Sequence, residues 1–312
     1  MTRLSLGRNE TMTPRDLDFH TLDAFTAVRH GGNPLAVVLD ADGIGPQEMQ
    51  RIAHEFNLSE TTFVQKATTP DAVFRVRIFT PTQELPFAGH PTVGTACILA
   101  ELGLAPPGAD VSFVLEESVG LVPVRVRRDA GQPAFGELTT AVPPIFGPAA
   151  PANEVLARML GLEATDIGLP GEPARTCTCG VPYVLVPLRQ PELLAAIAFD
   201  VAVWRVALAR AWAQQIYVYA RGYEGELRAR MFAPGVGVLE DPATGSAAVA
   251  LVGALALESP LRDGRLEWRI AQGQEMGRPS LLYGSAEKRK GAVTAVRVGG
   301  HAVRVSEGRV YR

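Results

Sequence analysis

Glu60 is the carboxylate whose neighbours in the sequence best suit proton transfer. It lies in the stretch LSETTFV, between Leu58 and Phe63, in an otherwise apolar and strand-like run. Burial in such a run raises the pKa of a carboxyl group, so that the group can remove a proton and later return it. The residues alone leave a second interpretation open, in which Glu60 is an exposed glutamate at the edge of a strand or the end of a helix.

Two further stretches place polar side chains beside a glycine. ELPFAGHP (residues 84–91) and EDPATGSA (residues 240–247) share the pattern E-x-P-x-x-G-(H/S) and stand half the chain length apart. Each follows a copy of R-x-R-(I/M)-F-x-P, which begins at Arg75 in the first half and at Arg228 in the second. Two matched copies of both patterns indicate an internal duplication, with a period that suits two similar domains and is too long for a solenoid.

An apolar run follows each copy of the glycine motif. Pro91–Leu102 and Ser246–Leu257 are apolar on nearly every face, which is typical of a helix that is buried all round. Helix N-termini carry unpaired N–H groups and a partial positive charge, which suit carboxylates and other anions. If the halves face each other, both helix starts line one cleft, and we expect a small anionic substrate there. The alternative is that Gly89 and Gly245 only allow tight turns into the helices.

The polar side chains beside these glycines are candidates for the same site. His90 begins the first helix, while Asp241, Thr244 and Ser246 surround the start of the second. Taken alone, a single histidine more often has a structural role, and Asp and Ser are common helix caps.

Glu84 and Glu240 recur in both copies of the motif. Because of this symmetry, we expect them to hold the loop ahead of each helix and to take no part in catalysis.

Short strands make up most of the remaining sequence. Runs of β-branched and aromatic residues bounded by Gly, Asn, Asp or Pro predict strands, and Pro46–Phe56 has the spacing of an amphipathic surface helix. We therefore expect an α/β (α+β) fold of two pseudo-symmetric halves, each a curled, mostly antiparallel sheet around a central apolar helix. The expected halves are residues 16–128 and 129–312, with the last strands able to pack back on the first half. Residues 1–15 are expected to be a loose extension, which leaves open whether Met1 or Met12 is the true start.

Composition excludes several classes of protein. The 312 residues are 47% hydrophobic and 20% charged, with a net charge of −3 and no basic cluster of the kind that binds nucleic acid. The longest apolar stretch, Ala247–Leu257, is shorter than the ~20 residues that span a bilayer, and the N-terminus lacks the apolar core of a signal peptide. The C-x-C pair, Cys177 and Cys179, lacks the further ligands of a zinc site. We expect a cytoplasmic protein that binds neither nucleic acid, membrane nor metal.

Five motifs in a fixed order resemble those of a known family. They are DAF at 23–25, GNPLAV at 32–37, NLSETTF at 57–63, FTPTQELPFAGHPTVGTA at 79–96 and EDPATGSAA at 240–248, and GRPS at 277–280 fits as well. From about Asp18 onward the sequence closely resembles the PhzF-like phenazine-biosynthesis proteins. The resemblance implies the diaminopimelate-epimerase-like fold, with the active site between two similar halves. It also implies a cofactor-independent isomerase, typically a homodimer, whose founding activity moves a proton between carbons of a hydroxylated dihydroanthranilate.

The resemblance also assigns roles to the candidate residues. Glu60 matches the catalytic glutamate of the family, and His90 matches its active-site histidine. Asp241 and Ser246 match residues on the second wall of the family's active-site cleft, which is formed by the start of the second helix. The expected catalytic residues are therefore Glu60, His90 and Asp241, and the expected substrate-binding residues are Gly89, Thr244, Gly245 and Ser246.

Other chemistries are less compatible with these residues. Epimerases of this fold use one cysteine at each wall, but neither glycine motif contains one, and Cys97 lies inside the first apolar run. Ser246 lacks the G-x-S-x-G pattern of a hydrolase, and no glycine-rich nucleotide loop is present. The main alternative is a non-catalytic protein of the same fold that binds a small acid or associates with itself. A binding module needs no acid/base carboxylate, so Glu60 favours an enzyme, although the sequence does not name its substrate.

Overall fold

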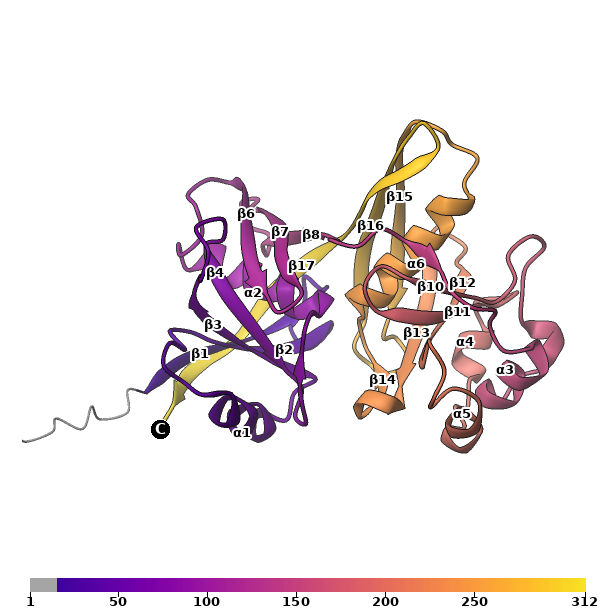
Figure 1. Cartoon of the computed structure of the whole chain (residues 1–312), viewed down its shortest axis with the longest axis horizontal. Coiled ribbons are helices and arrows are strands. Elements are labelled where there is room, and N and C mark those ends of the chain that lie inside the picture. The colour runs from indigo at the N-terminus through magenta and orange to yellow at the C-terminus, as the bar shows by residue number, and fades with distance from the viewer. Residues whose placement is uncertain (1–15) are drawn as a thin grey trace, which may run out of the picture.

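The computed structural model describes residues 16–312, so the extension expected over residues 1–15 lies outside it. The described chain forms two halves side by side (Figure 1). The first half contains β1 (Leu17–Ala24), β2 (Asn33–Val38), α1 (Pro46–Phe56), β3 (Glu60–Lys66), β4 (Phe74–Phe79), β5 (Glu84–Leu85), α2 (Gly89–Glu101), β6 (Asp110–Glu117), β7 (Gly120–Arg127) and β8 (Phe135–Thr139). Then follow β9 (Ile145–Phe146), α3 (Asn153–Leu160), β10 (Arg175–Thr178), β11 (Pro182–Pro187), α4 (Leu193–Ala196), α5 (Val201–Ala207), β12 (Gln215–Arg221), β13 (Leu227–Ala233), β14 (Val238–Asp241), α6 (Gly245–Glu258), β15 (Gly264–Gln272), β16 (Ser280–Arg289) and β17 (Ala292–Val310).

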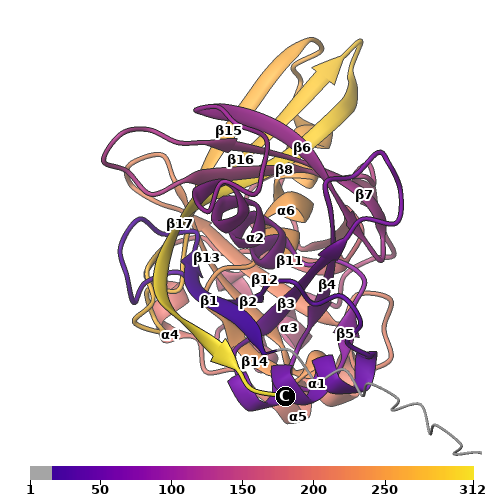
Figure 2. The ribbon, with the colours of Figure 1, turned by 90° about the vertical axis from the view of Figure 1, so that its left-hand side faces the viewer.

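Each half is a curled sheet around one apolar helix, as predicted. In the first half, α2 is buried from Gly89 to Ala100 and packs against β1, β2, β3, β7, β8 and β17 (Figure 2). In the second half, α6 is almost as completely buried and packs against β9, β10, β11, β15, β16 and β17. Most strand pairs are antiparallel; the parallel pairs are β2–β3, β4–β6, β11–β12 and β13–β15. Within residues 16–312, no helix is long and apolar enough to cross a membrane.

Shorter helices cover the outer surfaces of the sheets. The amphipathic helix predicted over Pro46–Phe56 is α1, which buries Met49, Ile52 and Ala53 in a small core with residues of β2, β3 and β4. In the second half, α3, α4 and α5 form a separate core with β11, β12 and β13, at the side of the molecule away from the first half (Figure 1). The shorter helices thus lie outside the sheets, whereas α2 and α6 contact each other at the junction between the halves.

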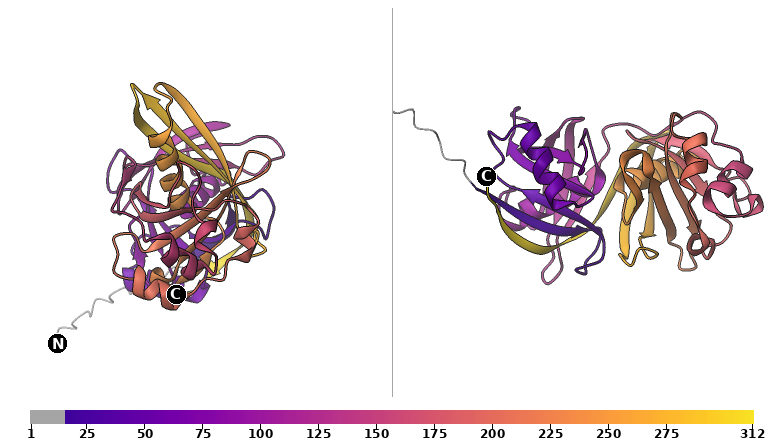
Figure 3. Two further views of the ribbon diagram at one scale, coloured as in Figure 1. Left: turned by 90° about the vertical axis from the view of Figure 1, so that its right-hand side faces the viewer. Right: turned by 90° about the horizontal axis from the view of Figure 1, so that it is seen from below.

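The long final strand, β17, belongs to both halves. Its first part pairs with β16, its middle with β8, and its last part with β1. The view from below shows this strand crossing from one half to the other (Figure 3). The boundary between the halves, expected after residue 128, stays a prediction. The next strand along the chain, β8, pairs both with β7 of the first half and with β17.

The duplicated motif produces the same ion pair in each half. The Arg77 guanidinium donates to both oxygens of Glu84, at 2.8 and 2.7 Å, and Arg230 does the same to Glu240, at 2.7 and 2.8 Å. Two-point contacts of this kind fix geometry as well as adding energy. These pairs hold the chain just ahead of α2 and α6, as expected for the repeated glutamates.

The starts of the two central helices touch through their glycines. A Cβ atom added to Gly89 would lie 2.6 Å from the Cα of Gly245, and one added to Gly245 would lie 2.9 Å from the Cα of Gly89. Neither glycine is among the residues with positive φ. Close approach of two backbones, and not a tight turn, therefore requires glycine here.

We predict that Gly89→Ser destabilises the protein by about 1–3 kcal/mol, as expected for overpacking. The new side chain would meet backbone atoms of Gly245 and Ser246, which can move only if the halves separate. The matched control is Gly45→Ser at the start of α1, where an added Cβ meets no atom within 4 Å. Urea unfolding of both variants measures the difference, and equal stability of the two would contradict the proposed contact.

Candidate active site

Glu60 and His90 meet beside the contact between the helix starts. Glu60 is the first residue of β3, and His90 is the second residue of α2. Glu60 Oε2 lies 3.1 Å from His90 Nε2, and the Glu60 side chain is only 14% exposed. Both atoms are buried, and within the described residues neither has a partner in hydrogen-bond geometry. The structure thus brings together two of the three residues predicted to be catalytic.

Burial favours the uncharged forms of this pair. It raises the pKa of Glu60 well above its usual value, and the nearby carboxylate of Asp241 raises it further. Burial also lowers the pKa of His90 to about 3, although a hydrogen bond to the backbone of Pro34 acts in the opposite direction. At neutral pH, His90 is therefore an uncharged imidazole beside a carboxyl group that retains its proton readily.

Asp241, the third predicted catalytic residue, approaches from the other half. Its Oδ1 accepts a hydrogen bond from Asn33 Nδ2 at 2.8 Å, and its Oδ2 accepts one from the hydroxyl of Thr244. Burial raises the pKa of Asp241, while the hydrogen bonds from Thr244 and Asn33 lower it. Asn33 Nδ2 also lies 3.0 Å from His90 Nδ1 and 2.9 Å from the carbonyl oxygen of Ala243. Asn33 therefore links the two walls of the site.

The role of Asn33 was not predicted from the sequence. The residue is the first of β2, which pairs in parallel with β3 so that Leu35 lies opposite Glu60. The available signal was the position of Asn33 in the GNPLAV motif. That motif contains no reactive group, so its polar role became visible only with the tertiary structure.

Two more unpredicted residues secure the start of α6. The Tyr183 hydroxyl lies 2.7 Å from Ser246 Oγ. Gln272 Nε2 donates to the carbonyl oxygen of Asp241 at 2.7 Å, and Gln272 Oε1 accepts from the backbone N–H of Thr244 at 3.3 Å. The predicted substrate-binding residues Gly89, Thr244, Gly245 and Ser246 thus lie around one point, supported by side chains of β11 and β15.

The cysteines lie in environments that disfavour thiol chemistry. Cys97, Cys177 and Cys179 are free and buried. Burial raises the pKa of all three thiols, to about 11 for Cys177. Since the thiolate is the reactive form, these side chains are poor nucleophiles and bases. Within residues 16–312, no three His, Cys, Asp or Glu side chains are grouped so that they could hold a metal ion.

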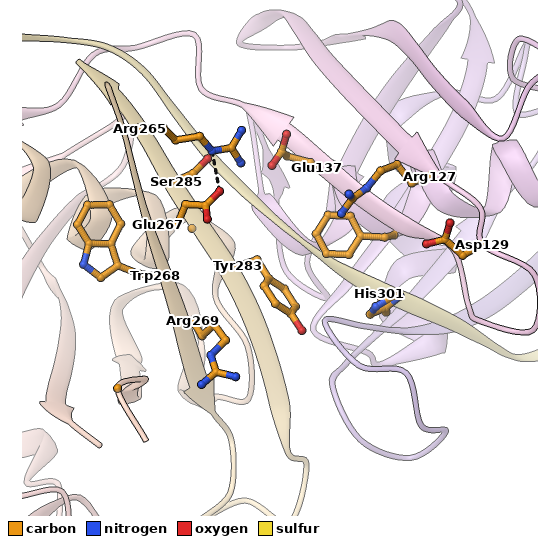
Figure 4. A pocket seen from close by; sticks show the side chains of 13 residues that line it. Arg127, Asp129, Glu137, Arg265, Glu267, Trp268, Arg269, Tyr283, Ser285 and His301 are labelled. Atoms are coloured by element: carbon orange, nitrogen blue, oxygen red, sulfur yellow. Dashed lines mark ion pairs between the residues drawn. The ribbon is translucent and has the colours of Figure 1, made fainter. Parts of the chain in front are cut away.

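A separate groove lies elsewhere between the halves (Figure 4). It has a volume of about 560 Å³, and its charged and aromatic lining residues are Arg127, Asp129, Phe135, Glu137, Arg265, Glu267, Trp268, Arg269, Tyr283 and His301. Arginines and carboxylates are present in equal number, and Arg265 pairs with Glu267 at 2.8 Å. The groove contains none of the buried acid/base groups described above, so size alone does not identify the site.

Comparison with known proteins shows the family of the chain. The family model described as phenazine biosynthesis-like protein matches residues 22–308. The chain belongs to this family. Among solved structures, the PhzF-family protein of Bacillus anthracis superposes with a TM-score of 0.85 at 29% identity, over 96% of this chain and 100% of its own.

Curated relatives of this PhzF-family chain are named as isomerases. A protein of Mesorhizobium japonicum named as an uncharacterized isomerase is 42% identical over 93% of this chain and 97% of its own length. The trans-2,3-dihydro-3-hydroxyanthranilate isomerase of Pseudomonas aeruginosa is 38% identical over 93% of this chain and 98% of its own. The PhzF-family chain is accordingly an enzyme of the isomerase class.

We predict that Asn33→Leu lowers the free energy of unfolding by about 1–3 kcal/mol, because buried acceptors lose their donor. In the native protein the Asn33 hydrogen bond lowers the pKa of Asp241. Its removal raises the folded-state pKa further above the unfolded value, so the loss of stability should be larger at pH 8 than at pH 4.

The matched control for Asn33→Leu is Asn153→Leu. Asn153 Nδ2 donates one hydrogen bond, to the uncharged carbonyl of Ile167 at 3.2 Å. Its loss should cost the same stability at both pH values, as measured by urea unfolding. A pH-independent loss for Asn33→Leu would show that Asn33 does not stabilise the Asp241 carboxylate.

Proposed function

We propose that the protein is a cofactor-independent isomerase that moves a proton between carbons of a small cyclic or amino carboxylic acid. The observation that carries this proposal is the buried 3.1 Å contact between Glu60 and His90, whose facing atoms have no hydrogen-bond partner within the described residues. A protein that only binds its ligand has no need for such a pair. The name of the Pseudomonas aeruginosa relative supports a cyclic carboxylic acid as the substrate class.

Glu60 acts as base and then as acid. As a carboxylate it removes a proton from a substrate carbon, and the electrons of the broken C–H bond spread over the conjugated system of the acid. The same carboxyl group then returns the proton to another carbon, so that one C–H bond breaks and one forms without a change in oxidation state. The raised pKa of Glu60 suits this exchange, because an acid/base group works best when its pKa lies near the working pH.

His90 and Asp241 manage the reacting end of the substrate together with Gly89. The amide of Asn33 donates to Nδ1 of the uncharged His90 imidazole, so the ring proton is on Nε2. Nε2 lies 3.1 Å from Glu60 Oε2 and donates to that oxygen when the two groups align, which holds the carboxyl group in one orientation. Asn33 contacts Nδ1 of the same ring and the carboxylate of Asp241. This network keeps the imidazole in place while the proton moves.

The start of α6 binds the substrate carboxylate. The first turn of a helix offers backbone N–H groups and a partial positive charge to an anion. Ser246 adds a hydroxyl that donates a hydrogen bond without titrating, and Tyr183 orients it. Since the Glu60 and His90 atoms are buried and Gly89 touches Gly245, the substrate reaches the site when the two halves move apart.

The cellular setting of this activity stays a prediction. We propose a cytoplasmic homodimer that binds neither nucleic acid nor membrane, on the basis of composition and family resemblance.

Solvent exchange tests the proposed activity directly. The protein is incubated in D₂O with trans-2,3-dihydro-3-hydroxyanthranilate and with other cyclic and amino carboxylic acids, and deuterium at carbon is followed by NMR. We expect incorporation into at least one acid. Binding of an acid by calorimetry without any exchange would instead support the non-catalytic alternative.

We predict that Glu60→Gln folds normally and lowers kcat by about 10²–10⁴-fold, the usual contribution of a general acid/base. The control is Cys97→Ala, which should retain activity because its thiol is buried inside α2 and protonated. Near-normal turnover by folded Glu60→Gln would contradict the assignment of Glu60 as the general acid/base. Loss of activity in folded Cys97→Ala would favour a thiol mechanism.

We predict that Ser246→Ala and His90→Ala affect different kinetic constants. A hydrogen bond to a charged group contributes about 1.5–3 kcal/mol, so Ser246→Ala should raise KM roughly 10- to 150-fold and spare kcat. His90→Ala should act mainly on kcat. Tyr183→Phe, which leaves the Ser246 hydroxyl in place, should raise KM less than Ser246→Ala does. A fall in kcat alone for Ser246→Ala would be incompatible with carboxylate binding at α6.

A further inference from the structure

Glu117 and Gln272 occupy equivalent places in the two halves. Glu117 ends β6, which pairs in parallel with β4, and Gln272 ends β15, which pairs in parallel with β13. Glu116, which precedes Glu117, lies opposite Arg75, the first arginine of the R-x-R motif. Ala271, which precedes Gln272, lies opposite Arg228, the first arginine of the second copy. The duplication has therefore placed a carboxylic acid in one half where the other half has the amide of the same shape.

Both side chains are attached to the start of a central helix. Gln272 donates to the carbonyl oxygen of Asp241 and to Thr244 Oγ1, at 2.7 and 3.2 Å, just before α6 begins. Glu117 Oε1 lies 2.5 Å from Thr92 Oγ1, which in turn lies 2.7 Å from the carbonyl oxygen of Ala88. Ala88 is the residue that precedes α2, and His90 lies in the turn between Ala88 and Thr92.

Counting protons along this chain of contacts favours a protonated Glu117. Three oxygens, on Glu117, Thr92 and Ala88, are joined by two short contacts. The Ala88 carbonyl can only accept, and the Thr92 hydroxyl has one proton to donate. If Thr92 donates to Ala88, as threonines in helices often do, the second contact needs a proton from Glu117. A charged Glu117 would leave two lone pairs facing each other across one of these contacts.

The surroundings of Glu117 also disfavour a charge. Its side chain is buried, its Oε2 has no hydrogen-bond partner, and within the described residues it makes no ion pair. Burial raises the pKa of Glu117 to about 8, and the hydrogen bond with Thr92 only partly opposes this. The titratable and charged groups on the neighbouring elements are His90, Cys97 and Glu101 of α2, Arg75 and Arg77 of β4, Asp110 and Glu116 of β6, and Arg125 and Arg127 of β7. Arg125 pairs with Asp110, at the end of β6 and β7 away from Glu117.

None of these neighbours compensates a charge on Glu117. His90 is buried and uncharged. Arg75 and Arg77 pair with Glu116 and Glu84, and β7 presents Gly120 opposite Glu117.

We propose that Glu117, in its protonated form, is a positioning residue that holds the first turn of α2 and thereby His90, as Gln272 holds the start of α6. Glu117 touches no reacting atom and acts through Thr92. Ionisation of Glu117 breaks the hydrogen-bond chain and loosens the turn that carries His90. The catalytic consequence rests on the function proposed above, whereas the protonation of Glu117 does not.

Stability as a function of pH tests the protonation. The unfolded glutamate ionises near 4.5 and the folded one near 8, so between these values the native protein holds a proton that the unfolded chain has lost. The contribution of the Glu117 proton to the free energy of unfolding is therefore fully present below pH 4.5 and is lost as the pH rises toward 8. Glu117→Gln does not titrate, so its folding equilibrium constant relative to wild type should rise about tenfold per pH unit in this window and then level off.

Either of two results would overturn the protonated state. One is a ratio of folding constants that does not change with pH. The other is a Glu117→Gln protein that fails to fold at neutral pH, since glutamine has the shape of the neutral acid and should replace it.

Thr92→Val tests the positioning role, because it keeps the shape of Thr92 and removes the hydroxyl. We expect kcat to fall roughly 10- to 100-fold with little change in KM, as misplacement of a catalytic group would cause. Glu117→Gln should keep kcat within a few-fold of wild type at pH 7 and should lose less activity than wild type above pH 8. The imidazole NMR signals of His90 should shift in Thr92→Val and stay unchanged in Glu117→Gln.

The NMR readout separates the two proposals. Unchanged His90 signals in Thr92→Val would contradict the positioning role, even if no substrate were turned over. Absence of proton exchange in the wild-type protein would contradict the proposed function and leave the stability and NMR results to decide the state and role of Glu117.

Discussion

The contact between Gly89 and Gly245 is the constraint on which the rest of the structure depends. Two helices meet there at their N-terminal ends, so closely that neither residue can carry a side chain. Each end has a partial charge of about +0.5, and two such ends repel each other. Negative charge between them offsets the repulsion, and the carboxyl group of Asp241 lies beside the start of α6. The same field would favour the substrate carboxylate that we propose to bind there.

The fold maintains this contact through features that are the same in both halves. The Arg77–Glu84 and Arg230–Glu240 pairs fix the segments that lead into α2 and α6. Apolar packing holds each helix inside its sheet, and β17 runs through both halves and ties them together. The chemistry depends on where the two copies differ. His90 stands where the other half has Ser246, and in the proposed function the first helix start takes part in proton transfer while the second binds the substrate carboxylate.

The sequence predicted the symmetric parts of the molecule well, because local patterns carry them. Unbroken apolar runs predicted both central helices, and helical spacing predicted α1. The roles of Asn33, Tyr183 and Gln272 could not be predicted, because each depends on a partner from a distant part of the chain. The path of β17 could not be predicted for the same reason, because its pairing with β1 joins the two ends of the described chain. The glycines were identified correctly, but only the structure shows that close approach, not turn geometry, requires them.

A crystal structure of the protein with a small cyclic carboxylate tests the central claim most directly. The account predicts that the carboxylate lies between the two helix starts, within hydrogen-bond distance of Ser246, with a ring carbon facing Glu60. An acid bound instead in the separate groove beside Arg127 and Arg269, with the helix starts unoccupied, would contradict it.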